Sequence, residues 1–165
     1  MRAAVLALAL LLLAPAAASA RTIDVPELFA DVLPKVNDRT EVPVRLPQRY
    51  ITDADELFAS GSGRKRSYSL GIAAIPDCGG ATACFVADFS AKRGEDPHYT
   101  RKLSLTGGRT GYFKPLSCGA SCSPPAIEWR QGGVLYSIQA HAGTKRQEKK
   151  RLRKMANSAI RNSPR

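Results

Sequence analysis

Two histidines are the side chains of this sequence best suited to moving protons near neutral pH. They are His98, in Asp96-Pro97-His98-Tyr99, and His141, in the segment 139–143. An imidazole can serve as a general base because its ordinary pKa lies close to physiological pH. No nucleophile elbow, zinc-peptidase, phosphate-binding or dinucleotide-binding motif accompanies either residue. A hydrolase of the cell envelope, with a dispersed site around His98 or His141 and no cofactor, is therefore one hypothesis.

Four cysteines carry the second kind of chemistry. Cys78 and Cys84 are separated by five residues and Cys118 and Cys122 by three, which matches neither a zinc ribbon nor a redox dithiol motif. No histidine lies close in sequence to act as a further metal ligand. Two disulfides remain, with three possible pairings. We favour Cys78 with Cys84 and Cys118 with Cys122, because each pair closes one short loop that contains glycine, and we expect no metal.

The third chemical feature is a cationic C-terminal segment. The chain has 165 residues and a net charge of +11. Residues 144–165 carry nine basic side chains against the single Glu148, whereas 15 basic and 13 acidic residues nearly cancel between Arg21 and Gly143. Such asymmetry bears on partners and solubility. The candidate binding residues for an anionic surface are Arg146, Lys150, Arg151, Arg153, Lys154 and Arg161.

A helix over about 144–161 is expected to position these cations. Thr144 and Gln147 have the spacing of a capping box, which predicts that Thr144 caps the helix through its side chain. An apolar stripe then recurs with helical period at Leu152, Met155, Ala156, Ala159 and Ile160. The helix should lie on a sheet with its basic face in water. That face either meets an anionic lipid or polymer of the envelope or is simply a solvated charged surface. Nucleic acid is not expected, because no aromatic residues alternate with the basic ones.

The N-terminal forty residues divide into two parts. Residues 1–20 have the pattern of a secretory signal: Arg2, an apolar run over 3–13, and small residues before Arg21. No transmembrane segment is expected after cleavage, and the protein should be periplasmic or extracellular. Residues 21–40 form an N-terminal helical segment in which Asp24 caps an amphipathic helix from Val25 to Leu33, and Pro34 ends it.

Residues 41–165 are predicted to form a single α+β domain. Residues 42–47 hold two prolines and suit an extended edge segment, residues 52–60 a helical turn, and residues 61–66 a flexible basic loop. Period-two alternation then predicts three consecutive hairpins, joined through the Cys78 loop, through Gly107-Gly108 and through Gly132-Gly133. They make an antiparallel meander of about five or six strands, covered by the C-terminal helix and by the short N-terminal helix. Its aromatic residues Tyr112, Trp129 and Tyr136 are either core or a ligand-holding surface.

Several segments together resemble a family of exported bacterial proteins of unknown function. They are Thr40-Glu-Val-Pro-Val-Arg-Leu-Pro47, Asp77-Cys-Gly-Gly-Ala81 with Cys84-Phe85, Gly111-Tyr-Phe113, Ser117-Cys-Gly-Ala-Ser-Cys-Ser-Pro-Pro125, Ile127-Glu-Trp129, Gly133-Val-Leu-Tyr136 and Met155-Ala-Asn-Ser-Ala-Ile160. The resemblance implies export and an α+β fold and transfers no catalytic residue. The sequence thus favours an exported binding module of the cell envelope over an enzyme.

Overall fold

A computed structural model describes residues 20–162, so most of the predicted signal segment lies outside the described residues. Within that range the chain forms eleven strands, three α-helices and one 3₁₀ turn. None of the helices in this range is long and apolar enough to cross a lipid bilayer. The predicted α+β class is confirmed.

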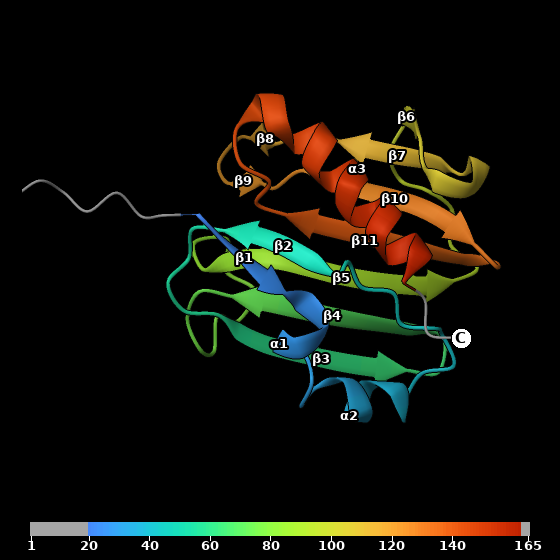
Figure 1. Cartoon of the computed structure of the whole chain (residues 1–165), viewed down its shortest axis with the longest axis horizontal. Coiled ribbons are helices and arrows are strands. Elements are labelled where there is room, and N and C mark those ends of the chain that lie inside the picture. Colours follow the sequence, from blue (N-terminus) through green and yellow to red (C-terminus); the bar gives the residue numbers. More distant parts are fainter. Residues whose placement is uncertain (1–19, 163–165) are drawn as a thin grey trace, which may run out of the picture.

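An antiparallel sheet of seven strands dominates the molecule (Figure 1). Its order is β3-β4-β5-β11-β10-β7-β6. The strands are β3 (Phe58–Arg64), β4 (Ser67–Ala73), β5 (Phe85–Arg93), β6 (Arg101–Ser104), β7 (Thr110–Lys114), β10 (Ala126–Gln131) and β11 (Val134–Ala140). The sheet has one or two strands more than expected, and it consists of two meanders. After β5 the chain crosses to the far edge and returns, so that β11 pairs with β5.

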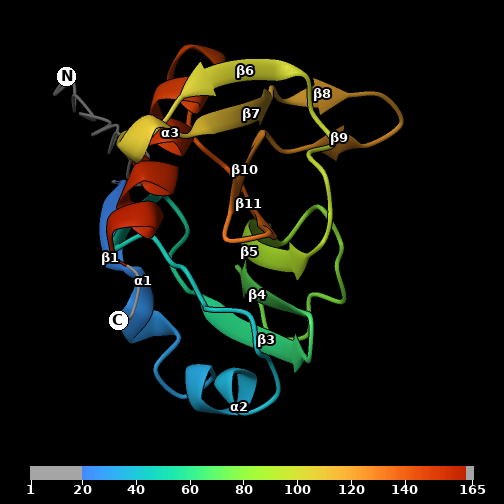
Figure 2. The same cartoon turned by 90° about the vertical axis from the view of Figure 1, so that its right-hand side faces the viewer.

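One face of this sheet is covered and the other is open. Helix α3 (Lys145–Arg161) and the ribbon of β1 (Arg21–Asp24) and β2 (Arg49–Thr52) lie on the covered face (Figure 2). The hydrophobic core fills the space between these layers, where Phe29 meets Phe89 edge to face at 6.1 Å between ring centroids. Side chains alternate across each strand, so every second residue points to the open face.

The N-terminal helix differs from the expectation. Two short helices, α1 (Val25–Leu28) and α2 (Leu33–Asn37), replace one continuous helix. The predicted cap is present, because the Asp24 carboxylate accepts a hydrogen bond from the Glu27 N–H at 3.1 Å. Pro34 was expected to end a helix but stands in the first turn of α2. A proline is tolerated there because the first helical N–H groups have no acceptor within the helix.

Residues 42–66 also correct three expectations. Residues 43–47 have no regular secondary structure and join no sheet, and the side chains of Val42, Val44 and Leu46 are buried. The expected helical turn over 52–60 and basic loop over 61–66 are instead the end of β2, a connection and β3. The sequence pattern did not predict β3, because the glycines in this segment have a low strand propensity. Glycine is required here: a Cβ on Gly63 would stand 2.5 Å from the Val36 carbonyl oxygen of α2.

Both favoured disulfides are confirmed, and their loops project from the open side of the sheet (Figure 2). Cys78 and Cys84 close the loop between β4 and β5, with their Cα atoms 5.9 Å apart. Cys118 and Cys122 join the short strands β8 (Ser117–Cys118) and β9 (Cys122–Ser123). Each bond closes a small ring, so it fixes a local loop more than it holds the fold together.

Candidate functional site

Helix α3 presents its cations as a narrow strip on the covered side of the sheet. Leu152, Met155, Ala156, Ala159 and Ile160 are buried, as the stripe predicted. At about 100° per residue, Arg146, Lys150, Arg153, Lys154 and Arg161 project within an arc of roughly 100° on the opposite side of the helix. All five side chains are exposed. Since a helix rises about 1.5 Å per residue, the strip is about 22 Å long. We call these five residues the cationic strip.

The charges of the strip are not neutralised within the described part of the chain. No carboxylate of residues 20–162 lies within 4.0 Å of a cation of α3, whereas Lys65, Lys92, Arg130 and His98 all have acidic partners. Glu148, the acid of the helix, is itself buried and accepts a hydrogen bond from the Leu116 N–H at 3.3 Å. The field of the strip therefore acts on the surroundings of the protein.

Two details of α3 differ from the sequence-based picture. Thr144 is the N-cap residue, but its side chain makes no capping hydrogen bond, so the predicted capping box is wrong. Arg151 is half-buried and lies on the flank of the helix, where its guanidinium covers the glycine at 143. Arg151 is therefore separated from the five cations of the strip.

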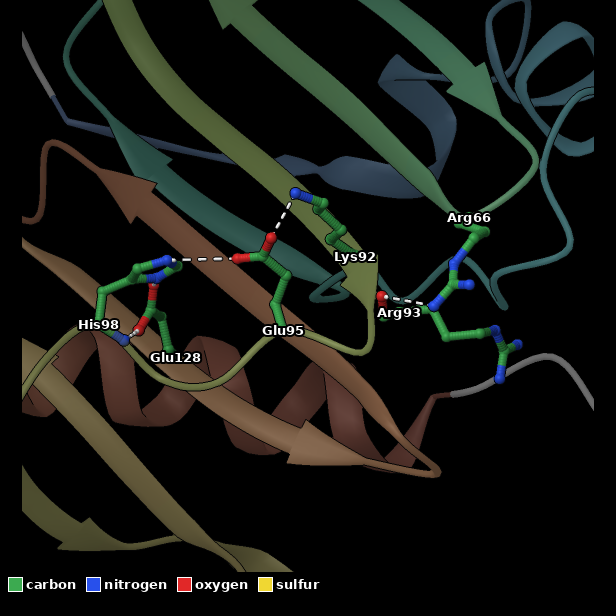
Figure 3. A network of polar contacts seen from close by, with 6 residues as sticks. All are labelled: Arg66, Lys92, Arg93, Glu95, His98 and Glu128. Atoms are coloured by element: carbon green, nitrogen blue, oxygen red, sulfur yellow. Dashed lines mark hydrogen bonds and ion pairs between the residues drawn. The ribbon is translucent and has the colours of Figure 1, made fainter.

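His98 belongs to a polar network on the open face (Figure 3). Its Nδ1–H donates to Glu128 Oε1 and its backbone N–H donates to Glu128 Oε2, both at 2.8 Å. On the other side, His98 Nε2 lies 3.4 Å from Glu95 Oε2, and Glu95 also pairs with Lys92. Glu128 is 3 % exposed, so the loop at 94–100 satisfies a buried carboxylate by folding back over β10.

The electrostatics of this network favour the charged imidazole. The hydrogen bond from His98 to Glu128, then its attraction to that carboxylate, raises the pKa of His98 above its ordinary value. The pKa of Glu95 is lowered, chiefly by its hydrogen bond to Lys92. Because both ring nitrogens of His98 face carboxylates, no free nitrogen is directed at a substrate. The arrangement favours a positioning role over a general base.

His141 lies elsewhere and does not meet His98. It is exposed and packs edge to face on Phe85 at 5.8 Å between ring centroids, at the start of β5. Its backbone N–H donates to the Val86 carbonyl, and its carbonyl accepts from the Tyr50 hydroxyl at 2.7 Å. The two histidines are thus parts of separate structural contacts. Within residues 20–162 no group of three or more His, Cys, Asp or Glu side chains is placed to hold a metal ion.

The sheet aromatics proposed as a ligand surface are mostly core. Trp129 and Tyr136 are 1 % and 2 % exposed and stack at 5.4 Å between centroids. The Arg45 guanidinium lies 5.3 Å from the centre of the Tyr136 ring and closes the stack. Tyr112 is half-buried and points to the open face, beside Glu128 in the strand register. None of the three leaves an open aromatic surface on the covered side.

Glu128 is the residue of this region that sequence reasoning missed. The signal lies in strand alternation: Ile127 and Trp129 point to the core, so Glu128 must point to the open face. What covers it there is a residue 30 positions away, which no local pattern reveals.

Comparison with known proteins finds no matching family model, no matching curated protein and no matching solved structure.

Proposed function

We propose that this is an exported protein that binds an anionic lipid surface through the cationic strip of α3. The observation that carries the proposal is the set of five exposed cations on one side of one helix, without a carboxylate partner among residues 20–162. Phospholipid head groups present a dense plane of phosphates, which suits a straight strip of charge. Docking of the apolar stripe on the sheet fixes the strip in position before any partner is met.

The expected strength follows from simple electrostatics. A Lys or Arg near an anionic membrane contributes about 1 kcal/mol, and the effect falls off within a Debye length of about 8 Å at physiological salt. Four residues of the strip therefore contribute about 4 kcal/mol at low salt, which corresponds to roughly a thousandfold in affinity. Binding through this strip needs no insertion of apolar side chains and should be reversible by salt.

Binding of the purified protein to vesicles of mixed phosphatidylglycerol and phosphatidylcholine tests this proposal. Wild-type protein should sediment with these vesicles at low salt and dissociate as salt is raised. It should not bind vesicles of pure phosphatidylcholine. A variant with Arg146→Gln, Lys150→Gln, Arg153→Gln and Lys154→Gln should bind on the order of 100- to 1000-fold more weakly.

The matched control removes the same charge elsewhere. Lys35→Gln, Arg39→Gln, Arg64→Gln and Lys102→Gln change four exposed cations outside α3. This control should keep most of the vesicle binding. Equal loss in the two variants would assign binding to net charge alone and overturn the proposal. Binding to a soluble acidic polysaccharide but not to vesicles would replace the lipid surface by an acidic polymer.

Export is the second part of the proposal. It is supported by the signal pattern of residues 1–20 and by two disulfides, which persist in oxidising compartments. Expression of the full chain in a bacterial host, followed by fractionation and N-terminal sequencing, should place the product outside the cytoplasm with Arg21 as its first residue. An unprocessed cytoplasmic product would contradict export and leave the vesicle test unaffected.

A further inference from the structure

The open face of the sheet holds a groove of about 1060 Å³, away from α3. It lies over the first half of β5 and the facing parts of β3 and β4, between the two disulfide loops. Ile75, on the Cys78 loop at its rim, is 52 % exposed, the most exposed large apolar side chain of the described residues. The groove is thus a built depression with disulfide-bonded rims on the side opposite α3.

Strand register places side chains of this groove in rows that run across the strands. One row across β3, β4 and β5 is Phe58, Ala73 and Phe85, so two aromatic residues stand on either side of a methyl group. The next row, continued onto β11, is Ser60, Gly71, Asp88 and Gln139. Neighbouring strands are about 4.8 Å apart, so the two phenylalanines are separated by roughly 10 Å. The small residues between them form the hollow.

A third row adds hydroxyl groups beside the groove. Ser62, Ser69, Ser90 and Ser137 are direct neighbours across four strands, and the first two line the groove. Ser69 Oγ donates to the Asp88 carboxylate at 2.8 Å, and Ser90 also bonds it. Burial raises the pKa of Asp88. A carboxylate has about four acceptor sites, so two hydroxyl donors leave it able to accept from a further donor.

The charge of the lining separates this groove from α3. No Lys, Arg or His lines it, and its ionisable side chains are Asp77 and Asp88. Lys114 reaches only Ser123 at its border, through a hydrogen bond of 2.5 Å. In a protein with a net charge of +11, a cation-free groove does not suit an anionic ligand.

From this juxtaposition of paired aromatics, hydroxyls, an amide and a half-buried carboxylate, we infer that the groove binds a neutral oligosaccharide. The apolar C–H face of a sugar ring packs on an aromatic side chain, and the hydroxyls at its edge donate to Asp88 and exchange hydrogen bonds with Ser60, Ser69 and Gln139. A volume of about 1060 Å³ has room for more than one sugar ring, so the groove suits a chain of sugars more than a single one. This inference is independent of the lipid-binding proposal.

The test is a titration of isotope-labelled protein with three neutral probes, followed by amide chemical shifts. The probes are maltohexaose, cellohexaose and the tetramer of N-acetylglucosamine. At least one should shift the amides of β3, β4 and the Cys78 loop, with a dissociation constant on the order of 1 mM or tighter. Because the ligand is uncharged, the affinity should not change with salt.

A cavity-filling variant keeps the fold while closing the site. A Cβ on Gly71 would meet only the Ser60 hydroxyl, at 3.3 Å, so Gly71→Val occupies the hollow with a good strand former. We expect Gly71→Val to weaken binding at least about tenfold while thermal unfolding shows an intact fold. Ser137→Val, on the same face but outside the lining, is the matched control and should bind as wild type does.

Each other outcome counts against the inference. It is overturned if none of the three probes shifts groove amides, if Gly71→Val binds as tightly as wild type, or if an acidic oligosaccharide binds there more tightly than the neutral ones. The α3 variant described above should retain sugar binding. Loss of vesicle binding with sugar binding retained, or the reverse, therefore tells the two proposals apart.

Discussion

The two faces of the sheet have opposite chemistry although they belong to one small domain. On the covered side, the cationic strip places five exposed charges along about 22 Å of helix. On the open side, the groove contains no cation and is lined by serines, two aspartates and two phenylalanines. The net charge of +11 is a property of the chain, whereas the fold places much of it on one face. The sheet separates the cationic strip from the groove.

The cations around the 94–100 loop on the open face differ from those of α3, because each has an acidic partner. Lys92 pairs with Glu95, which also faces His98, and His98 covers the buried Glu128. Arg130 pairs with Asp96 at 2.5 Å on the same side. These charges are paired locally, and their contacts hold the 94–100 loop over the sheet. The contrast teaches that several unpaired cations aligned on one side of one helix, rather than charge as such, mark the surface that faces a partner.

The largest of the predicted effects should follow from removing the apolar packing that holds α3 on the sheet. Leu152 is fully buried beneath the helix, and Leu152→Ala should lower the free energy of unfolding by about 2 to 5 kcal/mol. Urea unfolding measures this loss. Vesicle binding should fall as well wherever the helix detaches, because the cations then lose their fixed alignment.

Lys149 on the same helix supplies the control for that measurement. Its side chain is exposed, and Lys149→Ala should change the free energy of unfolding by less than about 0.5 kcal/mol. A loss below about 1 kcal/mol for Leu152→Ala would mean that α3 is not held by its apolar stripe, and the rigid strip would no longer follow from the fold.

Removing the second disulfide should affect the open face and leave the covered face unchanged, and the effect should be of intermediate size. Cys118 and Cys122 are exposed, so Cys118→Ser with Cys122→Ser removes little buried surface. Loop entropy predicts a loss of about 2 kcal/mol in the free energy of unfolding. Because Cys122 lines the groove and neither cysteine belongs to the cationic strip, sugar binding should weaken while vesicle binding stays unchanged. Weakened vesicle binding in this variant would show that the two faces are coupled.

Much of the sheet could be predicted from the sequence because its signals are local. The strands β4, β5, β10 and β11 follow from alternation, and the turn between the last two follows from Gly132 and Gly133, whose φ angles are +59° and +72°. The pairing of β5 with β11 has no local signal, since the strands are brought together by the return of the second meander. Strand β3 was not predicted because its glycines allow the close approach of α2 and Leu70, and these tertiary contacts leave no local signal in the sequence.

The candidate sites divide in the same way. The cationic strip could be predicted because a helix converts sequence spacing directly into a face. The groove could not, although Ser69, Asp88 and Gln139 alternate with core residues in their own strands, because only the register places them side by side. His98 was identified as a chemical candidate, but its partner Glu128 and the resulting engagement of both ring nitrogens depend on the fold of a distant loop.

The smallest predicted effect concerns the paired charges of the open face. The raised pKa of His98 means that its folded form binds a proton more tightly than its unfolded form, for which the ordinary value is 6.5. Its stabilising contribution is therefore fully present below pH 6.5 and is lost as pH rises through the raised pKa. Since the His98 side chain is 59 % exposed, solvent screening keeps this change below about 1 kcal/mol. The difference in free energy of unfolding between wild type and His98→Ala, measured by urea at a series of pH values, should shrink across that range. A difference that stays constant or grows with pH would mean that the Glu128 and Glu95 contacts do not favour the charged imidazole, and the contrast between paired and unpaired faces would rest on α3 alone.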